Sequence, residues 1–133
     1  MTSFSIDEFQ SIATGTLGRI GEAIAARYIE RNLQWQILAQ NWSCQYGELD
    51  LITQDDEVVV IIEVRTRRGA NAMDLALASV NQRKQEKLMM LADLYRDEAG
   101  ISHTTPIRID VVGIAIGNNG LAQVEMVRDA VGW

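Results

Sequence analysis

The sequence contains little cysteine and has no excess of positive charge. A single cysteine, Cys44, among 133 residues excludes an internal disulfide and a cysteine-based metal cluster. The formal net charge of −6 is opposite in sign to the basic balance of a general nucleic-acid binder. No apolar run approaches the roughly 20 residues of a membrane span, and the first residues lack a signal-like apolar core. We therefore expect a cytoplasmic protein with no membrane partner.

Length and composition predict one folded domain. Hydrophobic residues make up 47% of the 133 positions, which is enough for a core of its own. Proline occurs only at Pro106, and we find no repeat, low-complexity stretch or linker. We expect a single domain over residues 1–133, with residues 1–14 as a frayed N-terminal segment because they are polar and lack a clear period.

Apolar periodicity predicts an α/β fold. Leu17, Ile20 and Ile24 share one stripe of a helix over residues 16–31. Ser79 and Gln82 form a capping box that begins a second helix, which Gly100 ends. A further helical turn is expected over residues 74–78. The expected strands cover residues 34–41, 48–53, 57–65, 107–116 and 121–127, with a basic loop over 66–71 and a hairpin turn over 117–120. The order α-β-β-β-α-β-β predicts a mixed central sheet with helices on both faces.

Two acidic residues and a cation lie at the ends of neighbouring apolar runs. Alternation along a strand places Leu49 and Leu51 on one face and Glu48, Asp50 and Ile52 on the other. Glu63 and Arg65 likewise point the same way, so pairing of the two strands brings Asp50 and Glu63 together. Carboxylates suit a hard divalent cation such as Mg²⁺. We expect Asp50, Glu63 and the backbone carbonyl of Val64 as metal ligands, with Arg65 stabilising charge on a phosphate.

The only positively charged block of the sequence begins at this site. Residues 65–87 carry 6 basic and 2 acidic side chains, whereas residues 1–64 carry 3 basic and 10 acidic ones. A basic rim beside a carboxylate pocket suits a phosphodiester substrate. Glu22, at the edge of the first helix's stripe, is a candidate third acid. The candidate nucleic-acid contacts are Arg67, Arg68, Lys84 and Lys87, and Lys84 is also a candidate catalytic group.

Each of these residues also has a structural interpretation. Glu63 and Arg65 can form a surface ion pair, Glu22 can be a boundary residue, and Lys84 can extend its stem along the core. The arginines of the basic loop can simply be solvated. Three functions follow from these alternatives, namely a metal-dependent nuclease, a non-catalytic binding protein and a scaffold domain without a ligand.

Several sequence blocks occur in a specific order and spacing over about residues 15–133. These blocks are Gly21-Glu22, Asn41-Trp42, Gly47-Glu48-Leu49-Asp50-Leu51-Ile52, Ile62-Glu63-Val64-Arg65-Thr66-Arg67, Val80 to Lys84, Arg108-Ile109-Asp110-Val111-Val112 and Val127-Arg128-Asp129-Ala130. In these blocks the chain resembles the YraN-like family of small bacterial proteins. The resemblance implies the restriction-endonuclease-like fold, a three-layer arrangement related to archaeal Holliday-junction resolvases.

The resemblance also implies a set of site residues. The superfamily site is an acid on the first helix, an aspartate and then Glu-x-Lys, which correspond here to Glu22, Asp50 and Glu63, with Arg65 in the lysine position. Lys84 matches a lysine that the family places on the second helix. Arg65 departs from the family pattern, because guanidinium retains the charge but loses the compact, tunable amine of lysine.

These observations predict a nuclease that uses Mg²⁺ or Mn²⁺ to cleave nucleic acid, with DNA favoured over RNA. Branched DNA and recombination intermediates are the expected substrates, and Glu22, Asp50, Glu63, Arg65 and Lys84 are the expected catalytic residues. A homodimer is expected by analogy with the resolvases. The alternative is a non-catalytic nucleic-acid-binding or partner-binding protein on the same fold, in which Arg65 marks lost chemistry.

Overall fold

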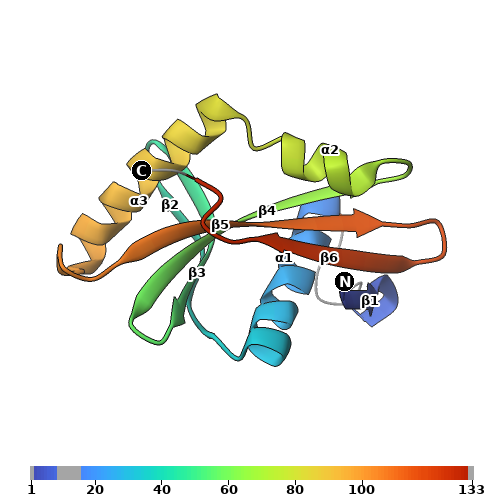
Figure 1. Cartoon of the computed structure of the whole chain (residues 1–133), viewed down its shortest axis with the longest axis horizontal. Coiled ribbons are helices and arrows are strands. Elements are labelled where there is room, and N and C mark those ends of the chain that lie inside the picture. Colours follow the sequence, from blue (N-terminus) through green and yellow to red (C-terminus); the bar gives the residue numbers. More distant parts are fainter. Residues whose placement is uncertain (1, 9–15, 132–133) are drawn as a thin grey trace.

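A computed structural model describes residues 2–8 and 16–131 of the chain (Figure 1). Its helices are α1 (Leu17–Tyr28), which continues as the π-helical turn η2 (Ile29–Leu33), α2 (Ala72–Ala78) and α3 (Gln82–Ala99). Its strands are β1 (Thr2–Ser5), followed by the 3₁₀ turn η1 (Ile6–Glu8), and β2 (Gln36–Cys44), β3 (Gly47–Asp55), β4 (Val58–Arg68), β5 (Ile107–Ile116) and β6 (Leu121–Val127).

The strands form one mixed sheet between two helical layers. Their order is β1-β6-β5-β4-β3-β2, in which β4 and β5 are parallel and every other neighbouring pair is antiparallel. One apolar cluster joins the sheet to α1 and a second joins it to α3 and to Leu77 of α2. This three-layer arrangement confirms the predicted α/β fold class and fits the restriction-endonuclease-like fold. None of the helices in residues 2–8 and 16–131 is long and apolar enough to span a membrane.

Several predicted elements are confirmed. β5 and β6 cover the predicted ranges, and the turn between them closes with a hydrogen bond from the Gly117 amide to the Leu121 carbonyl at 2.9 Å. Gly100 ends α3 in the left-handed conformation, with φ of 68°, which glycine adopts without a Cβ penalty. The predicted helical turn before α3 forms as α2.

Four predicted features are wrong in detail. Thr2–Ser5 is a sixth strand that pairs with β6, whereas residues 1 and 9–14 of the predicted frayed segment lie outside the described residues. β2 begins and ends later than predicted and includes Cys44. β4 extends through Arg68 because its pairing with β5 continues to Arg68 and Ile116, so the first half of the expected basic loop, residues 66–68, is strand. Asn81, not Ser79, caps α3, because its side chain accepts the Lys84 amide.

The β2–β3 hairpin leaves the sheet at Asp50. Residues 51–55 of β3 pair with β4, beginning with Leu51 opposite Ile62, whereas residues 47–49 pair only with β2. Leu49 therefore packs in the cluster under α3 and Leu51 in the cluster under α1. The prediction that both leucines face the same way is wrong, because alternation holds only while a strand stays in one sheet. The departure of the hairpin opens space beside β4.

A buried acid on β5, Asp110, holds the C-terminal segment by a hydrogen bond. Asp110 is fully buried and accepts hydrogen bonds from Arg108 Nε at 3.0 Å and from the Asp129 amide at 2.8 Å. The guanidinium groups of Arg108 and Arg128 both lie over the Trp35 ring, 5.3 and 5.2 Å from its centroid. The sequence blocks around Asp110 and Asp129 therefore serve the fold, because they join the chain end to the start of β5.

Close packing of α1 against β4 depends on Gly21. A Cβ at this position would lie 2.9 Å from Thr66 Cβ and still closer to Thr66 Oγ1. We expect Gly21→Ala to lower the free energy of unfolding by about 1–3 kcal/mol, because overpacking displaces neighbouring backbone. Gly18→Ala on the same helix is the control. It has open space around it and should be neutral or stabilising by up to about 1 kcal/mol. Denaturant melts measure both, and equal effects would contradict this packing argument.

Candidate active site

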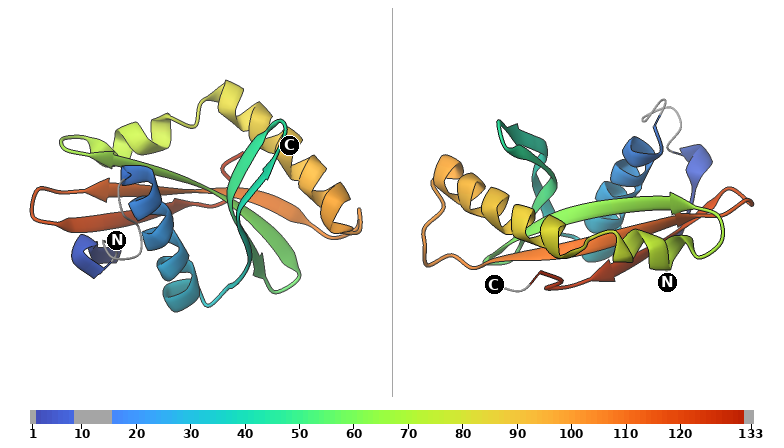
Figure 2. Two further views of the ribbon diagram at one scale, coloured as in Figure 1. Left: turned by 180° about the vertical axis from the view of Figure 1, so that it is seen from behind. Right: turned by 90° about the horizontal axis from the view of Figure 1, so that it is seen from above.

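A cleft lies where α1, the β2–β3 hairpin, β4 and α3 approach one another. Its volume is about 590 Å³, and its lining comprises Leu17, Gly18 and Glu22 of α1, residues 47, 48 and 50 of β3, residues 63–67 of β4, and Lys84, Lys87 and Leu91 of α3. Figure 2 shows that α1 and the β2–β3 hairpin rise on the same side of the sheet, and residues 63–67 of β4 line the cleft that they enclose. The cleft therefore has two raised walls and a strand as its floor.

Asp50 occupies the point at which β3 leaves β4. Its Oδ2 accepts a hydrogen bond from the Val64 amide at 2.8 Å. The carboxyl group thus replaces the backbone carbonyl that would accept this bond if β3 stayed paired with β4. Burial, together with the negative charge of Glu63, raises the pKa of Asp50 to about 8, although the Val64 amide opposes the shift. Near neutral pH the metal-free site thus holds a proton on Asp50, which limits the negative charge in the cleft.

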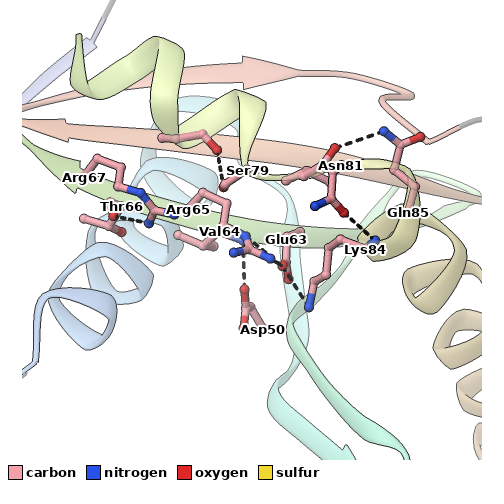
Figure 3. A network of polar contacts seen from close by, with 12 residues as sticks. Asp50, Glu63, Val64, Arg65, Thr66, Arg67, Ser79, Asn81, Lys84 and Gln85 are labelled. Carbon is pink, nitrogen blue, oxygen red and sulfur yellow. Dashed lines mark hydrogen bonds and ion pairs between the residues drawn. The ribbon is translucent and has the colours of Figure 1, made fainter.

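Glu63 is buried and bound by two cations (Figure 3). Arg65, two residues along β4, places Nη2 at 2.9 Å and Nε at 3.1 Å from Glu63 Oε2. Lys84, from the first turn of α3, places Nζ at 3.2 Å from the same oxygen. The Asn81 side chain caps that turn at 2.9 Å from the Lys84 amide and so fixes where the lysine begins. One carboxylate oxygen is therefore shared by both cations.

Glu22 and Glu48 bring further carboxylates to Asp50 from opposite walls of the cleft. One carboxylate oxygen from each of the three residues lies within 4.8 Å of the others. With its amide oriented to donate, the Asn41 nitrogen lies 2.9 Å from Glu22 Oε1 and 3.2 Å from Glu48 Oε1. Burial, followed by the charge of Glu48, raises the pKa of Glu22. Mutual repulsion of these acids favours occupation by a cation.

The structure thus brings together residues that are far apart in the sequence. Glu22, Asp50, Glu63, Arg65 and Lys84 all line the cleft, as do Val64, Arg67 and Lys87. Arg68 does not line it and is exposed at the end of β4. The Arg67 guanidinium donates to the Thr66 carbonyl at 2.9 Å.

Two polar residues near Asp50, Glu48 and Asn41, were not predicted as site residues. Glu48 lies on the Asp50 face of its strand by alternation, and this pattern is the signal that could have identified it. Asn41 gave no comparable signal, since its position depends on a left-handed backbone with φ of 53°, a conformation that asparagine tolerates better than most residues.

The donor set fits Mg²⁺ or Mn²⁺. Both ions prefer carboxylate and carbonyl oxygens to nitrogen or sulfur, and the three acids around Asp50 offer such oxygens within 4.8 Å of one another. The arrangement shares only Asp50 with the predicted ligand set of Asp50, Glu63 and the Val64 carbonyl. Glu63 is bound to Arg65 and Lys84, whereas Glu48 joins Glu22 and Asp50.

Comparison with known proteins places the chain in a family. A model of the uncharacterised protein family UPF0102 matches residues 21–114. A UPF0102 protein of Ectopseudomonas mendocina is 41% identical over 114 residues, which cover 86% of this chain and 92% of the relative. A UPF0102 protein of Roseiflexus castenholzii is 41% identical over 76% of this chain and 80% of its own length. One of Streptomyces coelicolor is 37% identical over 87% of this chain and 88% of its own length.

The matched residues 21–114 run from α1 to β5 and include every acid and cation that lines the cleft. The family match also confirms the resemblance to the YraN-like proteins that the sequence blocks indicated. The chain belongs to the uncharacterised protein family UPF0102.

Proposed function

We propose that this protein is a metal-dependent nuclease that acts on DNA, with branched DNA and recombination intermediates as its substrates. The observation that carries the proposal is the convergence of carboxylates and cations in one cleft. Glu22, Asp50 and Glu63 come from three different elements, and Arg65 and Lys84 lie among them. Hydrolysis of a phosphodiester needs both a cation held by oxygens and positive charge for the phosphate.

The acids of the cleft supply the metal site. Glu22, Glu48 and Asp50 are the residues that would hold Mg²⁺ or Mn²⁺, and Glu63 and Val64 line the same cleft. When bound, the ion polarises a phosphoryl oxygen and lowers the pKa of the attacking water. Because a ligand must be deprotonated to bind a metal, Asp50 has to release the proton that its raised pKa retains.

The cations of the cleft act on the phosphate. Arg65 and Lys84 both bind Glu63 in the absence of substrate, and their side chains are 24% and 29% exposed, so an anion can approach them. We infer that Lys84 takes the role of the lysine that position 65 lacks, since its amine reaches Glu63 from α3. Arg67 and Lys87 lie at the edge of the cleft, where flanking phosphates would pass.

A cleavage assay tests the proposal. Wild-type protein is expected to cut branched DNA in the presence of Mg²⁺ or Mn²⁺ and to lose this activity when the ion is chelated. Asp50→Ala should reduce cleavage to background while its melting curve stays cooperative, because it removes an oxygen ligand. Glu57→Gln, in the exposed β3–β4 turn, is the matched control and should cut normally. Equal cleavage by wild type and Asp50→Ala would indicate a contaminating nuclease and end the proposal.

Lys84 and Lys87 provide a matched pair on one helix. Lys84→Ala is expected to lower the cleavage rate about 10²–10³-fold, the loss typical of removing one donor to a charged transition state. Lys87→Ala removes the same charge one turn away, and we expect it to weaken binding with little change in the maximal rate. Single-turnover rates at saturating protein separate the two effects. Identical losses of maximal rate would remove Lys84 from the catalytic set.

A specific observation favours a second function, that of a non-catalytic DNA-binding protein. Arg65 contacts Glu63 through two nitrogens, and guanidinium cannot give up a proton as an amine can. Under this alternative the wild type binds DNA without cutting it, and Arg65→Lys restores cleavage. Under the nuclease proposal the wild type already cuts, and Arg65→Lys changes its rate by less than removal of Lys84 does.

A further inference from the structure

Tyr46 is an exposed aromatic side chain at the tip of the β2–β3 hairpin. It is 51% exposed. Every other phenylalanine, tyrosine or tryptophan within residues 2–8 and 16–131 is less exposed and is buried or half-buried. Its backbone lies in the two-residue turn between Cys44 and Gly47. An exposed aromatic at a hairpin tip contributes little to the core and leaves its ring open to a ligand, and tyrosine is enriched at such contact surfaces.

The hairpin tip is a rim of the cleft. Gly47 and Glu48, which follow Tyr46 directly, both line it. A Cβ on Gly47 would lie 3.1 Å from Lys87 Cε and 3.2 Å from a Leu91 methyl group, so the tip packs against the basic face of α3. Since consecutive Cα atoms are about 3.8 Å apart, the Tyr46 backbone is within about 8 Å of Glu48. Tyr46 itself does not line the cleft, so its ring can meet only a base next to a phosphate that the cleft holds.

Charge alone provides little affinity at this cleft. Its four acids, Glu22, Glu48, Asp50 and Glu63, face four cations, and two of those cations are already bound to Glu63. Four cations are fewer than the roughly 6–10 phosphate contacts of a strongly salt-dependent DNA-binding protein. Contacts that do not depend on charge would add affinity here, and the stacking of bases on aromatic rings is the usual source for single strands.

We propose that Tyr46 is a stacking platform for an unpaired base, so that the cleft selects DNA strands with unstacked bases next to the bound phosphate. This inference rests on the proposed function, and it defines the substrate class as single-stranded or branched DNA in preference to continuous duplex. The bases of a continuous duplex are stacked on one another and leave no open face for the ring. In a single strand, or at a branch point where base stacking is interrupted, that face is free.

Binding measured without metal tests this inference separately from cleavage. Fluorescence anisotropy with a labelled single strand and with a duplex of the same sequence gives both affinities. Tyr46→Ala should weaken single-strand binding about 5-fold to 150-fold, which corresponds to about 1–3 kcal/mol at 1.4 kcal/mol per tenfold. Duplex binding should change less than about twofold, since stacking contributes nothing there. Tyr46→Phe retains the ring and should bind as the wild type does.

Leu75→Ala is the surface control, because Leu75 is 55% exposed on α2 and does not line the cleft. Equal loss on single strand and duplex, or no loss with Tyr46→Ala, would overturn the stacking role even in an active nuclease. A selective loss would support it even if the protein proved unable to cleave. Failure of the wild type to bind either DNA would overturn the stacking role together with the proposed function.

Discussion

Asp50→Asn is expected to stabilise the metal-free protein increasingly as the pH rises. The pKa of Asp50 is about 8 in the folded protein, against an ordinary value of 3.8. Between these two values the folded state binds the proton and the unfolded state does not. The stability of the wild type therefore falls as the pH rises across this window. Asparagine has a similar shape, retains an acceptor for the Val64 amide and carries no charge, so the variant escapes this loss.

The pH dependence of the difference is the decisive measurement. At or below about pH 4 the two proteins should be of similar stability, because Asp50 is then protonated in the folded state and largely protonated in the unfolded state as well. Near pH 8 Asp50→Asn should be more stable by on the order of 2 kcal/mol. The pKa shift of Asp50 at about 1.4 kcal/mol per pKa unit would give more, but solvent at the open cleft screens part of the interaction. Urea melts without metal at both pH values give this difference in the free energy of unfolding. The titration of all other groups contributes equally to both proteins and cancels. A variant less stable at every pH would contradict this electrostatic account.

Asp110→Ala is expected to destabilise the protein by about 3–5 kcal/mol. Asp110 is fully buried, and its loss leaves the Arg108 guanidinium and the Asp129 amide without their shared acceptor. Removal of one partner from a buried ion pair is costly because the other remains desolvated. The attachment of the chain end to β5 is lost at the same time. Thermal and denaturant melts should both show the loss.

Asp55 supplies the matched control for this prediction. It also faces Arg108, at 3.8 Å, but its side chain is 35% exposed. Asp55→Ala should cost less than about 1 kcal/mol, as partly exposed ion pairs usually do. Equal destabilisation by Asp55→Ala and Asp110→Ala would mean that burial does not set the contribution of these acids.

The long elements were predictable from the sequence because their patterns are local. β5 and β6 follow apolar runs that end at strong turn residues, and the periodic Leu88, Leu91 and Tyr95 side chains of α3 are buried. β1 was not predictable, because four residues are too short to show a period and their pairing with β6 is set by tertiary structure. The position of the α3 cap also depended on where α2 ends.

The candidate site was predictable to the extent that it lies on strands. Alternation placed Asp50 with Glu63, and Glu63 with Arg65, on common faces. The meeting of Glu22 and Glu48 was not predictable, because it requires the β2–β3 hairpin to leave β4 at Asp50 and rise on the same side of the sheet as α1. The bond between Lys84 and Glu63 likewise depends on how closely α3 packs on the sheet. These distances arise from tertiary packing, which periodicity does not encode.

The claim that the cleft is a metal site is tested most directly by thermal melting with and without Mn²⁺, alone and with a branched DNA oligonucleotide. A metal that binds only the folded state must raise the melting temperature. The account predicts a rise for the wild type and for Glu57→Gln, and none for Asp50→Asn. No rise in the wild type under either condition, or an equal rise in Asp50→Asn, would contradict the account.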